Sequence, residues 1–409
     1  MDLIEALILI STILQAIVTG SFLCLDISTK SLQTTWGFST DKMVKVGTIG
    51  YSLGFLITAL YSLFISKISP KITILIGGLL TSLSWLGIYF SLCHKCVTWE
   101  ISMILEAGVC SGTSLSYMSA ATIITESNNS ERRKVKLIIL ALFVAVGSII
   151  AFLIFIDLDN IKTVILIMLG FSILSTILVF LSSFLYIKET MLLFPNEENP
   201  EVKFSGSFFL YLFSLNISFG IIMTFINNGN GLLDSFEQKW NNQNTKTQLP
   251  LICFVIGNLV GRFTGIFLKN YLEHILFLFS FFSFVITFLS SFLLIYWRIE
   301  LVFAILCASS VFFGLIWTLS MPLARSFFSI REDRSLGMIF VGASIGPVIF
   351  GLSSSWLYHY HHLHSHVCDY RCYWVYLCLS TMACFATIIT YVCSWYKRGN
   401  ERIESQDRI

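Results

Sequence analysis

The most restrictive feature of this 409-residue chain is its series of long, predominantly apolar stretches. A helix needs about 20 apolar residues to cross the hydrocarbon core of a membrane, and these stretches have that length. Charged residues make up only 12% of the chain, whereas soluble domains carry about 25%. These features exclude a soluble enzyme, a disordered scaffold and a secreted disulfide domain. They predict an all-α polytopic membrane protein.

The apolar stretches predict twelve transmembrane helices. Their ranges are about 4–25, 44–66, 72–92, 100–124, 137–156, 163–187, 208–227, 250–268, 275–297, 300–324, 336–357 and 373–396. We expect the first of them to be a true span and not a cleaved signal peptide, because Asp2 and Glu5 precede it and no Lys or Arg occurs before Lys30.

A short polar stretch at 188–207 divides six predicted helices from six others. We therefore predict an N-terminal six-helix bundle at 1–187, a cytoplasmic linker at 188–207, a C-terminal six-helix bundle at 208–396 and a cytoplasmic tail at 397–409. Most Lys and Arg residues then fall on the side of the two termini, which the positive-inside rule places in the cytoplasm. Two six-helix halves around a site near the bilayer midplane are typical of secondary transporters.

Five short segments add a family resemblance. They lie at 30–54 (KSL, then WGFST and two glycines), 131–147 (ERRK and a glycine), 225–229 (FINNG), 257–262 (GNLVGR) and 368–373 (two cysteines and a tyrosine). In their order, they resemble the nodulin-like branch of the major facilitator superfamily, which includes homologues of monocarboxylate transporters. The resemblance implies the twelve-helix major facilitator fold and transport of small solutes by alternating access. One departure is the loop at 64–71, which keeps two lysines but lacks the acidic residue usual for the superfamily.

Arg262 and Asn258 are the leading candidates for binding a solute. A guanidinium within a membrane span is costly unless it faces protein or water, and its planar fork suits a carboxylate or a phosphate. Asn258 lies one helical turn earlier on the same face. The resemblance implies an Asp at this position in monocarboxylate carriers, and an Asn cannot titrate. Alternatively, Arg262 lies near a helix end, where it anchors the helix or braces a neighbouring one.

Other polar residues within the spans are candidates for proton coupling, solute binding or helix packing. Glu106 is either a proton-coupling acid, since burial disfavours its charged form, or a residue of a hydrated vestibule. Asn227 and Asn228 are either solute ligands beside a broken helix or partners in helix-to-helix hydrogen bonds, and we expect the latter role for Asn216.

Histidines cluster in one loop on the predicted outer side. Its members are His359, His361, His362, His364 and His366, followed by Cys368 and Cys372. Four of them (His361, His362, His364 and His366) are weak candidates for a metal site, because imidazole and thiolate are common metal ligands. A disulfide in an oxidising compartment and a plain polar loop are the alternatives.

Small residues and tryptophans predict packing and membrane anchoring. Gly108 and Gly112 in the fourth span, and Gly257 and Gly261 in the eighth, recur at four-residue spacing, which lets helices approach closely. Trp85 is expected at a membrane interface, where its amphipathic ring is favoured.

The function that we predict is secondary transport of a small organic anion, such as a monocarboxylate, by alternating access. The lipid bilayer is the expected environment and the proton is a candidate coupling ion. We expect no cofactor, no nucleic-acid partner and no enzymatic activity, since the chain has no H-E-x-x-H motif and no His within a predicted span. The alternative is a solute-sensing membrane receptor or scaffold without net transport.

Overall fold

The computed structural model describes fifteen stretches of the chain. They are residues 10, 12–20, 32, 35–62, 68, 70–94, 97–125, 130–157, 161–190, 206–227, 249–268, 285, 299–328, 337 and 339–353. Almost all of these residues are α-helical, and no β-strand occurs among them. This architecture confirms the predicted all-α class.

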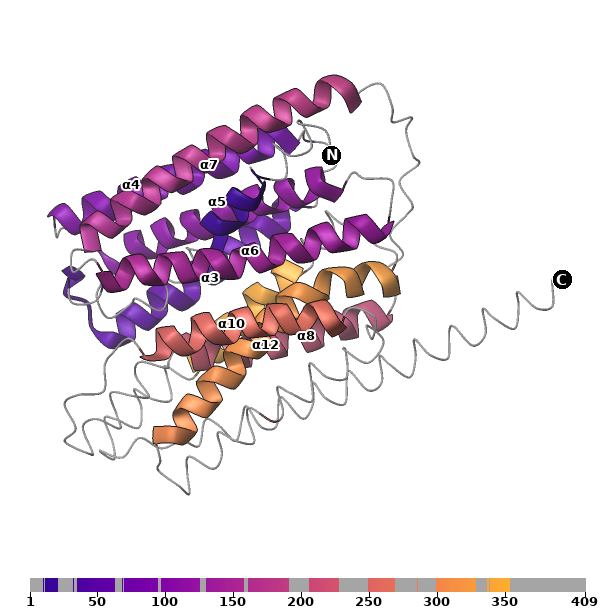
Figure 1. The fold of residues 1–409 in the computed structure, drawn as a ribbon. Helices are drawn as coiled ribbons and strands as arrows, with labels where there is room; N and C mark the ends of the chain where they lie inside the picture. The colour runs from indigo at the N-terminus through magenta and orange to yellow at the C-terminus, as the bar shows by residue number, and fades with distance from the viewer. Residues whose placement is uncertain are drawn as a thin grey trace.

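Eight long helices carry the fold (Figure 1). They are α3 (Thr40–Ser62), α4 (Pro70–His94), α5 (Trp99–Thr125), α6 (Ser130–Asp157), α7 (Ile161–Thr190), α8 (Gly206–Asn227), α10 (Leu249–Leu268) and α12 (Ile299–Phe328). Two further helical stretches are described at 12–20 and 339–353. Each coincides with a predicted span. The predicted span at 373–396 lies outside the described residues, as does the span at 275–297 except for residue 285.

Local sequence explains where two of these helices begin. Helix α4 begins at Pro70, because a proline has a preset φ and needs no amide partner in the first turn. Before α3, Gly37 adopts a φ of 73°, a left-handed conformation that glycine reaches without a steric penalty. The chain then enters α3, whose first turn is joined to Ser39 by a bond from the Met43 amide. Helix α7 runs to Thr190, three residues into the stretch that we predict as the linker.

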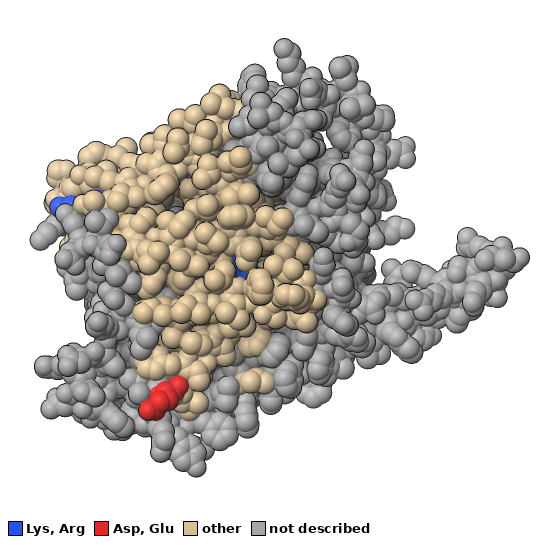
Figure 2. Space-filling view, in the orientation of Figure 1, with Lys and Arg blue, Asp and Glu red and all other residues tan. Residues whose placement is uncertain are grey.

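The outer surface of these helices is apolar. Three described helices are long and apolar enough to cross a membrane, at Ile72–His94, Ile161–Leu178 and Glu300–Ser320. Large side chains such as Leu83, Ile104 and Phe267 are more than half exposed, and Figure 2 shows a described face with few charged side chains. Such a surface is unfavourable in water, and it is the expected surface of a protein embedded in lipid.

The helices pack in two groups that meet along α6. Helix α4 packs against α5 and α7, and α3 packs against α5. Helix α12 packs against α10 and α8, and both α10 and α12 also contact α6 (Figure 1). Helices from before and after residues 188–207 are therefore in direct contact, and the candidate site lies between them.

Glycines allow the closest of these helix contacts. A Cβ added at Gly108 or Gly112 would collide with Ser84 or with Thr81 of α4. A Cβ added at Gly261 would collide with the Val311 carbonyl of α12. The predicted role of the small residues in packing is therefore confirmed at these positions, as close backbone approach in membrane proteins requires.

We expect Gly261→Ala to destabilise the protein by about 1–3 kcal/mol, because the added methyl group must push α10 and α12 apart. Thermal unfolding of the purified protein in detergent measures the effect as a lower Tm. Gly170→Ala is the matched control, because nothing lies within 4 Å of a Cβ added at Gly170. An equal fall in Tm for the two variants would contradict the packing role of Gly261.

The prediction for Trp85 is wrong. Its ring is only 1% exposed and belongs to the hydrophobic core. Position 85 lies well inside α4, so the ring is enclosed by neighbouring helices. The preference of tryptophan for a membrane interface applies to rings that reach lipid headgroups, and Trp85 does not.

Candidate functional site

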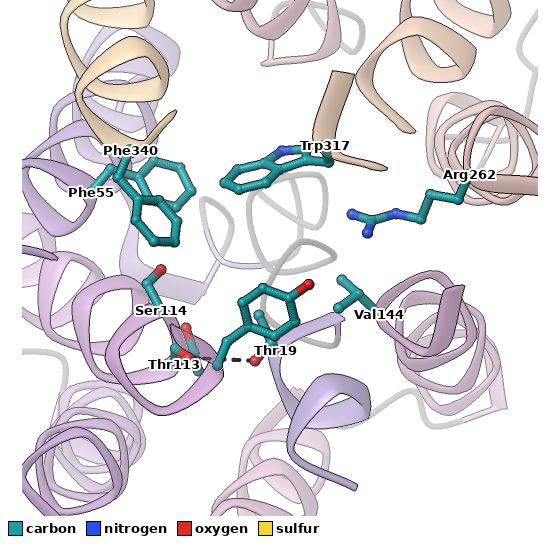
Figure 3. A pocket seen from close by; sticks show the side chains of 9 residues that line it. Thr19, Phe55, Thr113, Ser114, Val144, Arg262, Trp317 and Phe340 are labelled. Carbon is teal, nitrogen blue, oxygen red and sulfur yellow. Dashed lines mark hydrogen bonds between the residues drawn. The ribbon is translucent and has the colours of Figure 1, made fainter. Parts of the chain in front are cut away.

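A small cavity lies between the two groups of helices (Figure 3). Its lining comes from the 12–20 helix, α3, α5, α6, α10, α12 and the 339–353 helix: Thr19, Phe55, Thr113, Ser114, Tyr117, Val144, Arg262, Trp317 and Phe340. Its volume is about 30 Å³, above the roughly 10–15 Å³ that one water molecule requires. The cavity therefore has room for water or a very small solute in this conformation.

Arg262 supplies the one formal charge among the lining residues. The side chain is 3% exposed and extends from α10 toward the cavity (Figure 3). Its Nε donates to Asn258 Oδ1 at 2.9 Å, and its Nη1 donates to the Ala141 carbonyl of α6 at 2.7 Å. A buried guanidinium is costly without such bonds, so these two acceptors stabilise it.

Asn258 holds the guanidinium in place. It is fully buried, and its Oδ1 accepts from the arginine side chain one turn further along the same helix. Its Nδ2 has no hydrogen-bond acceptor among the described residues. A buried donor without an acceptor is unfavourable, so an acceptor brought by a solute or a water molecule is favoured beside Arg262.

Hydroxyl groups line the part of the cavity formed by α5. The Thr19 hydroxyl lies 2.9 Å from the Gln15 carbonyl and 3.5 Å from the Thr113 carbonyl, to which Figure 3 draws a dashed line. The Tyr117 hydroxyl is close enough to Arg262 to interact with it electrostatically. This side of the cavity therefore presents polar groups that can hydrogen-bond a solute or water.

Aromatic rings form the opposite side of the cavity. Phe55 of α3 and Phe340 of the 339–353 helix stack with ring centroids 5.2 Å apart and planes inclined by 20°. The indole of Trp317 packs against both, at 5.7 Å from Phe55 and 5.5 Å from Phe340. Such ring contacts stabilise a structure beyond the area that they bury, so they join the two groups of helices firmly here.

The structure places some of the predicted site residues at the cavity and others away from it. Arg262 and Asn258 lie together, Arg262 at the cavity, and its bond to Ala141 also agrees with the alternative that Arg262 braces a neighbouring helix. Glu106 is 5% exposed but does not line this cavity. Its stem lies beside Gly50 of α3, where a Cβ would come within 3.1 Å of Glu106 Cβ.

The remaining predicted site residues fall at or beyond the limits of the described chain. Asn227 is the last residue of α8. Asn228 and the histidines His361, His362, His364 and His366 lie outside the described residues. Asn216 has the expected helix-to-helix role, because its Oδ1 accepts from the Gly346 amide at 3.2 Å.

The sequence analysis did not predict two features of the interior, a hydrogen bond and a group of aromatic rings. Ser175 donates to Gln15 Oε1 at 2.6 Å and thereby joins α7 to the 12–20 helix. The signal was available, because Gln15 is a lone amide within an apolar span. The rings of Phe55, Trp317 and Phe340 gave no such signal, since the chain has 37 phenylalanines in similar apolar surroundings.

A motif at 342–346 was also missed. These residues (GASIG) match the G-x-S-x-G pattern of serine hydrolases, in which the serine occupies a sharp turn between a strand and a helix. Here the motif lies inside a continuous helix, and Ser344 donates to the Val341 carbonyl at 2.8 Å. Gly346 lies against Asn216 of α8. The motif therefore serves helix packing, and its geometry does not suit a nucleophile.

Comparison with known proteins supports the fold. No family model matches the chain, and no curated protein matches it. A solved structure of a bacterial homologue of the iron transporter ferroportin, in an outward-facing state, is similar with a TM-score of 0.70. A second structure of such a homologue, with soaked iron, gives 0.67. Each comparison covers 95% of this chain and 99% of the other, at 14% identity.

The chain shares the helical fold of these two structures. At 14% identity the likeness concerns the fold and not the solute. The nodulin-like resemblance stays a prediction, since the comparisons do not test which branch the chain belongs to. An all-helical fold of this kind, with an apolar surface, identifies an integral membrane protein.

Proposed function

We propose that this protein is a secondary transporter that carries a small organic anion, of the monocarboxylate type, by alternating access. The observation that carries the proposal is the Arg262 guanidinium at a cavity between two groups of helices. The major facilitator type of fold supports transport, and the resemblance of 257–262 and 225–229 to the nodulin-like branch supports an organic solute.

The chemistry of the lining favours an anion. Arg262 is permanently charged and offers N–H groups in a planar fork that matches a carboxylate. Asn258 adds a buried Nδ2 donor with no acceptor among the described residues. Asn258 does not itself line the cavity, so a carboxylate bound there supplies acceptors to the guanidinium, and in a site shielded from water such charged hydrogen bonds are strong.

A divalent metal ion is the competing cargo, because two similar structures are homologues of an iron transporter. A positive guanidinium at the cavity repels a cation, so the described residues favour the anion. Metal-ion transport is therefore the alternative that an uptake experiment must distinguish.

Uptake into proteoliposomes that contain this protein alone tests the proposal. We expect uptake of pyruvate, lactate or acetate above that of protein-free vesicles, and thermal stabilisation of the purified protein by the same anions, since a ligand of the native state raises Tm. Uptake of Fe²⁺ or Mn²⁺ but of no anion would replace the proposed cargo. Stabilisation by an anion without uptake would favour a solute-sensing receptor.

Glu106 is our candidate for coupling transport to protons. Its carboxyl is buried in α5, and a carboxyl in such surroundings can bind and release a proton as its exposure to water changes. Glu106→Gln is permanently neutral, so we expect anion uptake to rise at low pH in the natural protein and to stay level in this variant. Uptake is measured against external pH at a fixed anion concentration, and an unchanged pH profile would exclude Glu106.

A further inference from the structure

Two cysteines face each other across the contact of α10 with α12. Cys253 lies on α10 and Cys307 on α12, and both are free thiols. The Cys253 thiol donates a hydrogen bond to the Cys307 sulfur. Two thiols in direct contact on different helices are a feature that the proposed transport of an anion does not use, so we ask what chemistry they support.

The register of the two helices places the thiols together independently of their hydrogen bond. Gly257 of α10 lies against residues 307–311 of α12, and Gly261, one turn further along, lies against residues 311–315. The two helices therefore run parallel here and advance together, and counting back one turn from Gly257 brings the two thiols side by side. A Cβ added at Gly257 would come within 3.0 Å of the Cys307 carbonyl oxygen. The backbones thus approach closely, as the Cα–Cα distance of about 5.5–6 Å in a disulfide requires.

The two thiols differ in their exposure. Cys307 is exposed on the outer surface of the helices, whereas Cys253 is only 7% exposed. A peroxide is small and uncharged, so it reaches Cys307 at this surface before it reaches the shielded Cys253. An accessible cysteine beside a second cysteine that can resolve its oxidised form is the arrangement of oxidation-sensitive pairs. The exposure therefore assigns Cys307 as the thiol that is oxidised first and Cys253 as its resolving partner.

We propose that Cys253 and Cys307 form an oxidisable dithiol, which a peroxide converts to a disulfide between α10 and α12. In the first step the Cys307 sulfur attacks one oxygen of hydrogen peroxide, the O–O bond breaks, and a sulfenic acid and one water form. In the second step the Cys253 sulfur attacks the Cys307 sulfur, the S–O bond breaks, the S–S bond forms and a second water leaves. The two thiols lose two electrons and two protons, and the peroxide is reduced to water.

The disulfide would join two helices that both reach the cavity. Arg262 of α10 and Trp317 of α12 line it, and Arg262 lies nine residues beyond Cys253, about 14 Å at the rise of an α-helix. Because the helices already touch through Gly257 and Gly261, the new bond holds them in their present register. A disulfide also restricts the unfolded chain, so we expect the oxidised protein to unfold at a higher temperature, whichever solute it carries.

Mass spectrometry of the purified full-length protein tests the proposal. The protein in detergent is treated with hydrogen peroxide or with dithiothreitol, the remaining thiols are blocked with N-ethylmaleimide, and the chain is digested without reduction. After peroxide we expect a linked peptide that contains Cys253 and Cys307 and is lighter by two hydrogen atoms than its two parts, together with a rise in Tm. Dithiothreitol is expected to reverse both changes. Recovery of both cysteines as maleimide adducts, or as separate sulfinic acids, would overturn the proposal.

Serine variants assign the roles of the two thiols. In Cys253→Ser the resolving thiol is absent, so we expect a sulfenic acid at Cys307 that dimedone traps, whereas Cys307→Ser yields neither the adduct nor the rise in Tm. Cys110→Ser is the matched control, because Cys110 is buried and its Sγ donates to the Tyr51 carbonyl at 3.4 Å, and it is expected to keep the linked peptide. The Tm of each variant in dithiothreitol reports whether it is folded. A peroxide-induced rise in Tm that persists in Cys307→Ser would contradict the joining of α10 to α12.

Discussion

Replacing Arg262 by Gln is expected to weaken binding of the transported anion by at least about 30-fold. Loss of one partner of a buried charged pair costs about 2–5 kcal/mol, and each 1.4 kcal/mol changes Kd tenfold. The neutral amide keeps a polar group on a shorter side chain, so the change removes the charge, the fork and part of the reach. Isothermal titration of pyruvate into the purified variant measures the new Kd, and its Tm without ligand reports whether the variant is folded.

Arg262→Lys is the control for this result. Lysine preserves the positive charge but not the planar fork, so we expect its Kd to lie between those of the natural protein and Arg262→Gln. Equal Kd values for all three proteins would place anion binding elsewhere in the chain. A large loss in both variants would assign the affinity mainly to the bidentate geometry.

The positions of the helices were largely predictable, because the bilayer fixes the length of an apolar span and every backbone amide within it must be paired. The span expected at 72–92 is α4 (Pro70–His94), and the proline that begins this helix is visible in the sequence. The span expected at 250–268 is α10 (Leu249–Leu268). In both cases local composition alone carries the information.

The rotation and partners of each helix were not predictable in the same way. Arg262 stood out as a charge in an apolar span, but its acceptor in α6 is the backbone carbonyl of Ala141, 121 positions earlier. Any residue supplies such a carbonyl, so the sequence contains no trace of this bond. Its discovery required the packing of α6 against α10.

Glu106 illustrates the same limit along a single helix. Its burial follows from its position inside an apolar span, and the structure agrees. Thr113, which lines the cavity, lies seven residues further along α5, about 10 Å at the rise of an α-helix. The sequence shows that Glu106 and Thr113 share a helix face, but the level at which the cavity opens depends on α3, α6 and α12.

The second large effect is expected for Phe55→Ala, which removes the ring that joins α3 to the C-terminal helices. Phe55 is 3% exposed and contacts Tyr51, Trp317 and Phe340, with the Tyr51 centroid 4.4 Å away. Truncating a buried phenylalanine costs about 3–5 kcal/mol because an unfilled cavity remains. We therefore expect a marked fall in Tm, measured by thermal unfolding in detergent.

Phe171→Ala is the matched control for Phe55→Ala, because Phe171 is 44% exposed on α7 and exposed substitutions usually change stability by less than about 0.5 kcal/mol. The space vacated at Phe55 adjoins the cavity, so a small hydrophobic carboxylate such as benzoate is expected to restore part of the lost Tm in Phe55→Ala and none in Phe171→Ala. Similar Tm values for the two variants would contradict the role of the aromatic rings in joining α3 to the 339–353 helix. If Phe55→Ala shows the expected fall in Tm but benzoate restores none of it, the space left by the Phe55 ring is not part of the solute cavity.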